Sequence, residues 1–88
     1  MANHASALKR ARQNENRRVR NKAVRTRVRG AIKSVRQAIE AKDQEAARAA
    51  LTVAEPIIDK AASKGVLPKR TAARKISRLA QQVHALNA

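Results

Sequence analysis

Aliphatic residues recur at helical spacing in three stretches of the chain, which are separated by two short links. The first stretch runs from about Ala5 to Ala41, and its second half carries aliphatic residues at intervals of 4, 4, 3 and 4. They are Val24, Val28, Ile32, Val35 and Ile39. At 100° per residue these positions fall within an arc of about 80°. The pattern predicts one long helix whose second half packs against other helices.

The second stretch has the same spacing and a clear signal at each end. Its apolar positions are Ala47, Leu51, Ala54, Ile58 and Ala61. Asp43 precedes the stretch and is predicted to cap the helix N-terminus. Gly65 follows Lys64, where a left-handed residue commonly ends a helix. These signals predict a second helix that ends at about Lys64.

A third helix is predicted after the turn at Leu67 and Pro68, with Pro68 and Thr71 setting its start. Its apolar seam is Ala72, Ile76, Leu79, Val83 and Leu86. No segment alternates with period two, so no strand is predicted. Three helices joined by short links predict an all-α fold, an antiparallel three-helix bundle with an extended, highly basic first helix. The 88 residues form a single domain, with residues 1–23 as the extension and residues 24–88 as the bundle.

Two residues oppose the local pattern. Pro56 has no backbone N–H to bond Thr52, and we interpret it as a kink inside the second helix. The alternative is a true break followed by a short helix at residues 57–64. Gly30 weakens the first helix by about 1 kcal/mol relative to Ala, and it either permits a close backbone approach or is a tolerated weak point.

Composition narrows the possible functions. Lys and Arg number 21 against 6 Asp and Glu, a net charge of +15, and the chain has no aromatic residue and no Cys. Repulsion among these positive charges opposes compaction, and a polyanionic partner would relieve that repulsion. The absence of Cys excludes disulfides and thiolate zinc sites, and the absence of aromatic rings excludes modules that stack bases. The chain is predicted to be a small basic binding protein.

The cations are arranged in stripes rather than mixed with acids. One stripe lies about 100° around the first helix from its apolar face. Its members are Arg18, Lys22, Arg25, Arg29, Lys33 and Arg36. N-terminal to Val24 the apolar face itself becomes polar. Residues 1–20 are therefore predicted to project beyond the bundle and to stay largely disordered until phosphates bind. The candidate contacts in the extension, residues 1–23, are Lys9, Arg10, Arg12, Arg17, Arg18, Arg20 and Asn21.

The third helix carries a second basic surface. Arg70, Arg74 and Arg78 recur every four residues, on the face predicted to lie opposite the apolar seam. They are flanked by Lys69 and Lys75. Arg suits a bidentate grip on phosphate, so both surfaces are predicted to bind phosphate groups of a polyanion.

No residue pattern supports catalysis or a cofactor. His4 and His84 have no acid or second ligand at metal spacing, and both are predicted to be solvated. No Ser has a His and an acid suggested as partners, and no Gly-rich phosphate loop is present. A membrane-active helix is also disfavoured, because residues 1–23 hold only Leu8 and Val19 as large apolar side chains. The chain is predicted not to be an enzyme.

Nearly the whole chain resembles the bacterial small-subunit ribosomal protein twenty family. The resemblance covers the stretches MANHASALKRARQNENRRVRNKAVRTRVRGAIKSVRQAI and DKAASKGVLPKRTAARKISRLAQQV. Its most specific parts are Ser6 to Arg10, Arg17-Arg18 with Arg20-Asn21, Ile32-Lys33, Pro56-Ile57 with Asp59, Lys64-Gly65, Ala72-Ala73-Arg74 with Lys75, and Ser77-Arg78-Leu79.

The resemblance implies a structural constituent of the small ribosomal subunit, located in the cytoplasm and monomeric within the ribosome. Family members bind small-subunit (16S) ribosomal RNA directly and early in assembly. Their first helix threads between segments of the 5′ domain and approaches the long helix near the 3′ end. This chain departs from the family at Pro68 and Arg70, where His and Asn are usual, so contacts made through those two residues do not carry over. A general nucleic-acid-coating protein and a helix-swapped dimer stay open as alternatives.

Overall fold

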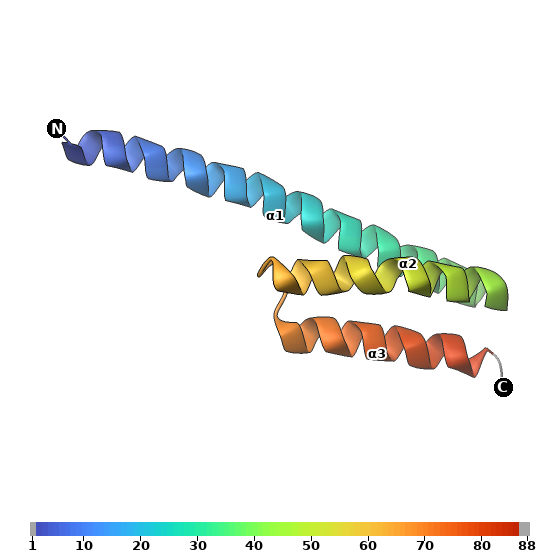
Figure 1. Cartoon of the computed structure of the whole chain (residues 1–88). Helices are drawn as coiled ribbons and strands as arrows, with labels where there is room; N and C mark the ends of the chain where they lie inside the picture. The colour runs from blue at the N-terminus through green and yellow to red at the C-terminus, as the bar shows by residue number, and fades with distance from the viewer. Residues whose placement is uncertain (1, 87–88) are drawn as a thin grey trace.

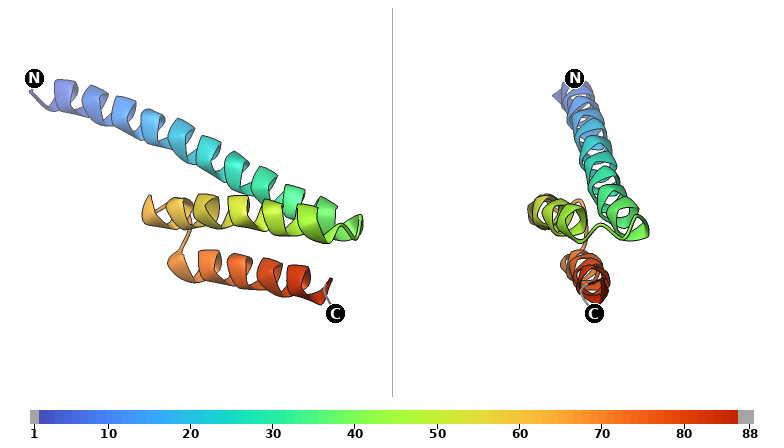
Figure 2. Two further views of the ribbon diagram at one scale, coloured as in Figure 1. Left: turned by 45° about the vertical axis from the view of Figure 1, so that its right-hand side comes forward. Right: turned by 90° about the vertical axis from the view of Figure 1, so that its right-hand side faces the viewer.

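The computed structural model describes the backbone of residues 2–86 and the side chains of residues 5–86. Three helices account for most of it: α1 (Ala2–Glu40), α2 (Gln44–Ser63) and α3 (Lys69–Ala85). Figure 1 shows α2 running back along the second half of α1, and α3 running back along α2. The end-on view in Figure 2 shows the three axes as a triangle. Within residues 2–86 there is no strand, which confirms the all-α bundle with a long first helix.

The link between α1 and α2 reverses the chain in three residues. Lys42 adopts a left-handed conformation with φ 56°, and the amide N–H of Asp43 bonds the carbonyl of Ala38 at 3.1 Å. This pairing ends α1 at Glu40, one residue before the expected end. The side chain of Asp43 accepts a hydrogen bond from the N–H of Ala46 at 3.1 Å, which confirms it as the cap of α2.

The link between α2 and α3 confirms one expectation and corrects another. Gly65 has φ 75°, and the N–H of Val66 bonds the carbonyl of Ala61, so a left-handed residue ends α2 as predicted. Pro68 lies just before the first turn of α3 and gives that helix no side-chain cap. Among the described side chains, Thr71 makes no capping hydrogen bond either, so the expectation that Thr71 helps to set the start is wrong. The first bond of the helix joins the Pro68 carbonyl to the N–H of Ala72.

The core is narrow and rich in alanine. Its buried side chains are Val28, Val35, Ala47, Ala54, Ile58, Ala61, Val66, Ala72, Leu79 and Val83. Ile58 and Val35 are the largest that are completely buried. Alanine at the contact positions lets the helices approach closely but removes little apolar surface from water. The bundle therefore depends on a few aliphatic side chains.

Pro56 lies inside α2, which continues without interruption to Ser63. The alternative of a break with a separate helix at residues 57–64 is therefore wrong. At Gly30 a Cβ would meet nothing within 4 Å, so no segment of the chain itself requires a glycine there. Gly30 is a weak point of α1 and not a site of close helix packing.

Replacing Pro56 with Ala is expected to raise the melting temperature of the free protein. Ala restores the N–H that bonds Thr52 and removes the ring from the preceding turn, a gain of about 1–3 kcal/mol after the loss of proline's rigidity in the unfolded chain. In a domain of this size each kcal/mol is worth roughly 4–8 °C. Thermal unfolding followed by circular dichroism measures the change. A lower melting temperature would show that Pro56 fixes a backbone shape that the bundle needs.

The first half of α1 projects far beyond the bundle (Figures 1 and 2). The chain extends 67 Å along its longest axis, and its radius of gyration is 17.7 Å, whereas a compact chain of this length has about 12 Å. Its accessible surface is 6919 Å², against about 5100 Å² for a compact protein of the same mass. Every side chain from residue 5 to residue 20 is exposed. This segment has no contact with the core to hold it.

Amide exchange in the free protein is expected to be fast across residues 8–20 and slow around Val35 and Ile58. Isolated helices of this length are marginal in water, and like charges along the segment weaken it further. Binding of RNA is expected to slow the exchange of residues 8–20 by screening the charges. Exchange followed by NMR, with and without RNA, gives the comparison. Strong protection of residues 8–20 without RNA would show a preformed rod.

Candidate nucleic-acid interface

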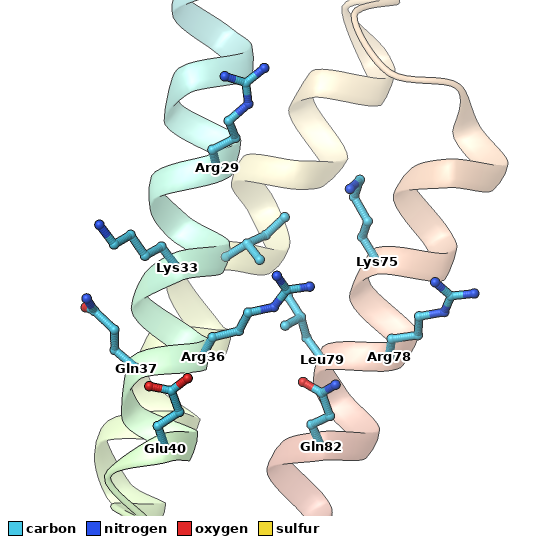
Figure 3. Close-up of a pocket in the computed structure, with 10 residues that line it drawn as sticks. Arg29, Lys33, Arg36, Gln37, Glu40, Lys75, Arg78, Leu79 and Gln82 are labelled. Atoms are coloured by element: carbon cyan, nitrogen blue, oxygen red, sulfur yellow. The ribbon is translucent and has the colours of Figure 1, made fainter.

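A groove between α1 and α3 is lined by a part of each predicted basic surface (Figure 3). Its volume is about 740 Å³, and Ile32 and Leu79 are its aliphatic lining residues. The cations along it are Arg29, Lys33, Arg36, Lys75 and Arg78. In Figure 3 the side chain of Arg36 extends from α1 toward α3, while Arg78 points away from α1. The groove is therefore bordered by positive charge from both helices.

The packing of the helices explains why these cations meet. On α1 the basic stripe lies beside Ile32, which packs against the core, so the stripe faces the side where α3 docks. On α3 the groove is lined by Lys75 and Arg78 together with the buried Leu79. Arg78 lies about 100° around α3 from Leu79, so it lines the edge of the groove and also shares an exposed hollow with Arg74 on the outward face.

The charge of the groove is almost unopposed. Glu40 is the one carboxylate among its lining residues, against five cations. No ion pair within 4.0 Å joins it to any of them in the described part of the chain. Lys75 is half-buried, so its aliphatic stem covers apolar surface while its ammonium group can reach solvent. Such a surface suits a ligand with several negative charges.

Arg18, farther up the stripe, is paired with an acid. Its Nη2 lies 2.7 Å from Oε1 of Glu15, one turn earlier, and its Nε donates to Oε2 at 3.1 Å. Hydrogen bonds from Arg18 and its positive charge lower the pKa of Glu15, and the same contacts raise the pKa of Arg18. Both side chains are well exposed, 65% and 59%, so the solvent screens the pair. An anionic partner has to compete with Glu15 for this arginine.

The other predicted residues lie outside the groove. Lys22 and Arg25 are exposed on α1 between Arg18 and the groove, so they continue the stripe. The cations of the projecting segment are also exposed: Lys9, Arg10, Arg12, Arg17 and Arg20. Lys69, Arg70 and Arg74 are exposed on α3 and do not line the groove. The structure therefore divides the α3 set into Lys75 and Arg78, which line the groove, and three cations that do not.

Asn21 marks the point where α1 leaves the bundle. It is half-buried, and its Oδ1 is shielded from solvent with no hydrogen-bond donor in reach. Only the amide nitrogen of Asn21 can donate to an anionic partner, because the amide oxygen is an acceptor.

Three cations that the sequence analysis did not single out lie between α1 and α2, on another side of α1 from the groove. Arg27, Lys60 and Lys64 line a notch between α1 and α2, together with Val53, Pro56 and Ile57. Arg27 is about 160° around α1 from Arg29, so it does not belong to the predicted stripe. Lys60 and Lys64 lie near the end of α2, where the helix dipole alone favours a cation. Their positions in the sequence therefore gave no sign of a role in binding.

Within the described residues, no group of three or more His, Cys, Asp or Glu side chains could hold a metal ion. His84 is exposed, as expected, whereas the side chain of His4 lies outside the described residues. None of α1, α2 and α3 combines the length and the apolar composition that a membrane crossing requires.

Fold and site together define a small, basic, all-helical protein with faces for a polyanion. The family described as Ribosomal protein S20 matches residues 2–84. Similar proteins include the small ribosomal subunit protein bS20 of Desulfatibacillum aliphaticivorans, 55% identical over 98% of both chains. That of Nitratidesulfovibrio vulgaris (strain DP4) is 56% identical over 96% of this chain and 97% of its own. The chain belongs to the ribosomal protein S20 family: it is a cytoplasmic constituent of the small ribosomal subunit and not an enzyme.

Proposed function

We propose that the chain binds small-subunit (16S) ribosomal RNA directly and stabilises its fold during assembly. The observation that carries the proposal is the groove between α1 and α3, where five cations from two helices face one carboxylate. Phosphate groups would replace the missing counter-charge. The bundle holds the two rows of cations in a fixed relation, so the groove favours a folded RNA over an unstructured one.

The projecting half of α1 supplies a second part of the interface. Its exposed cations lie on several sides of the helix, including the face that packs on the core farther along. A helix of this kind can thread between RNA segments and contact phosphates on each side. We propose that these segments belong to the 5′ domain and to the long helix near the 3′ end, and that the protein acts as a monomer in the ribosome.

The alternative function is general coating of nucleic acid. The projecting segment favours it, because cations on all sides of a helix bind phosphates without regard to sequence. The groove argues against it, since a simple coating protein has no need to align cations from two separate helices.

Binding of the RNA is expected to weaken steeply with salt. Each phosphate contact contributes a slope of about −0.7 to −0.9 to log Kobs against log salt concentration, and five or more contacts predict about −4. Filter binding of the purified chain to small-subunit ribosomal RNA between about 50 and 200 mM salt measures the slope. A slope shallower than about −2 would contradict an interface built from the groove and the extension together.

A further inference from the structure

The notch between α1 and α2 combines exposed apolar surface with positive charge. Val53 is 61% exposed, although it is a large aliphatic residue in the middle of α2, and Pro56 beside it is exposed as well. Arg27, Lys60 and Lys64 surround this apolar floor. No carboxylate lines the notch, and none of the three cations takes part in an ion pair within residues 5–86. Packing of the bundle explains none of these exposed apolar groups.

Size and chemistry limit what can occupy the notch. Its volume is about 240 Å³, below the roughly 300 Å³ at which pockets for drug-sized ligands begin. The three cations require negative charge around the occupant, and the aliphatic floor requires an apolar surface within it. One nucleotide satisfies both, because its sugar and base offer apolar surface and phosphates lie on either side of it. The notch has no aromatic ring and no amide side chain, so such a contact reads no base sequence.

We propose that the notch is a second RNA-binding subsite, which holds one unstacked nucleotide with its sugar or base on Val53 and Pro56. The flanking phosphates bind Arg27, Lys60 and Lys64. This inference rests on the proposed function. Because the notch and the groove lie on different sides of α1, the two sites take two different RNA segments. The chain then joins these segments through the bundle itself, in addition to any contacts of the extension.

The test uses the full chain, small-subunit ribosomal RNA and three variants that each lose two charges. The notch variant is Lys60→Gln with Lys64→Gln, and the groove variant is Arg29→Gln with Arg36→Gln. The control is Lys42→Gln with Arg48→Gln, two exposed cations that line neither site. Thermal unfolding of each variant shows that the bundle persists.

The notch variant is expected to bind about tenfold more weakly than the control, with a salt slope less steep by about 1.4–1.8. Chemical probing of the RNA is expected to show nucleotides that lose protection only in the notch variant, and others that lose it only in the groove variant. Val53→Ala removes apolar surface without a change of charge. It is expected to weaken binding about threefold and to leave the salt slope unchanged.

Each other outcome contradicts the inference in a distinct way. If the notch variant matches the control while the groove variant binds weakly, the subsite is wrong and the proposed function stands. If the notch variant binds naked RNA normally but fails to assemble with the other small-subunit proteins, a protein covers the notch. If neither the notch variant nor the groove variant differs from the control, the RNA occupies neither site, so the subsite is wrong and the proposed function loses the observation that carries it.

Discussion

Replacement of Arg29 and Arg36 by Gln is expected to weaken binding to small-subunit ribosomal RNA on the order of a hundredfold. Both arginines line the groove, and each can donate a charged hydrogen bond to phosphate. Such a bond is worth about 1.5 kcal/mol or more, so the loss of two corresponds to about 3 kcal/mol. Gln is nearly as good a helix former as Arg, and both positions are exposed, so the bundle should persist. Filter binding at fixed salt gives the affinity ratio.

The matched control separates the groove from net charge. Lys42→Gln with Arg48→Gln removes the same two charges at exposed positions away from the groove. We expect it to weaken binding by about threefold or less, because a distant charge acts only through the screened general field. Equal losses in the control and the groove variant would show that the RNA responds to total charge and does not occupy the groove.

Replacement of Ile58 by Ala is expected to lower the free energy of unfolding by about 2–5 kcal/mol. Ile58 is completely buried in α2 and is one of the two largest such side chains among residues 5–86. Its neighbours one turn away, Ala54 and Ala61, are too small to fill the space that it leaves. Small domains have only a few kcal/mol of stability, so a large part of the population should unfold near 37 °C. Urea unfolding followed by circular dichroism measures the change.

Val53→Ala is the control for this experiment on the same helix. Val53 is 61% exposed, and its truncation is expected to change stability by about 0.5 kcal/mol or less. A loss at Ile58 no larger than the loss at Val53 would mean that α2 does not hold the bundle together. It would also contradict the account of a bundle that depends on a few buried aliphatic residues.

The helices and their links could be predicted because their signals are local. The spacing of Val28 and Val35 on one helix face, the cap at Asp43 and the left-handed Gly65 each act within a few residues. The start of α3 was harder: Pro68 directly precedes the helix as predicted, but Thr71 gives no cap, and the helix begins without a side-chain cap. The last residue of α1 depends on a left-handed Lys42, a conformation that lysine seldom adopts.

The candidate site was only partly predictable, because it depends on how the helices rotate against each other. The stripe on α1 could be recognised from the sequence alone, but its meeting with Lys75 and Arg78 could not. Spacing along α3 groups Arg78 with Arg74, and the two do share an exposed hollow, but only docking of α3 on α1 shows that Arg78 also lines the groove. Arg27 was overlooked for the same reason, since its neighbours in the notch come from another helix.

The central claim is that this chain recognises folded small-subunit ribosomal RNA and does not bind any polyanion equally well. Competition between that RNA and random duplex RNA of equal length, at physiological salt, tests it most directly. The account predicts that random duplex competes at least about a hundredfold less well, because it cannot fill the groove and receive the extension at once. Equal competition by the two RNAs would contradict the claim and would identify the chain as a general nucleic-acid-coating protein.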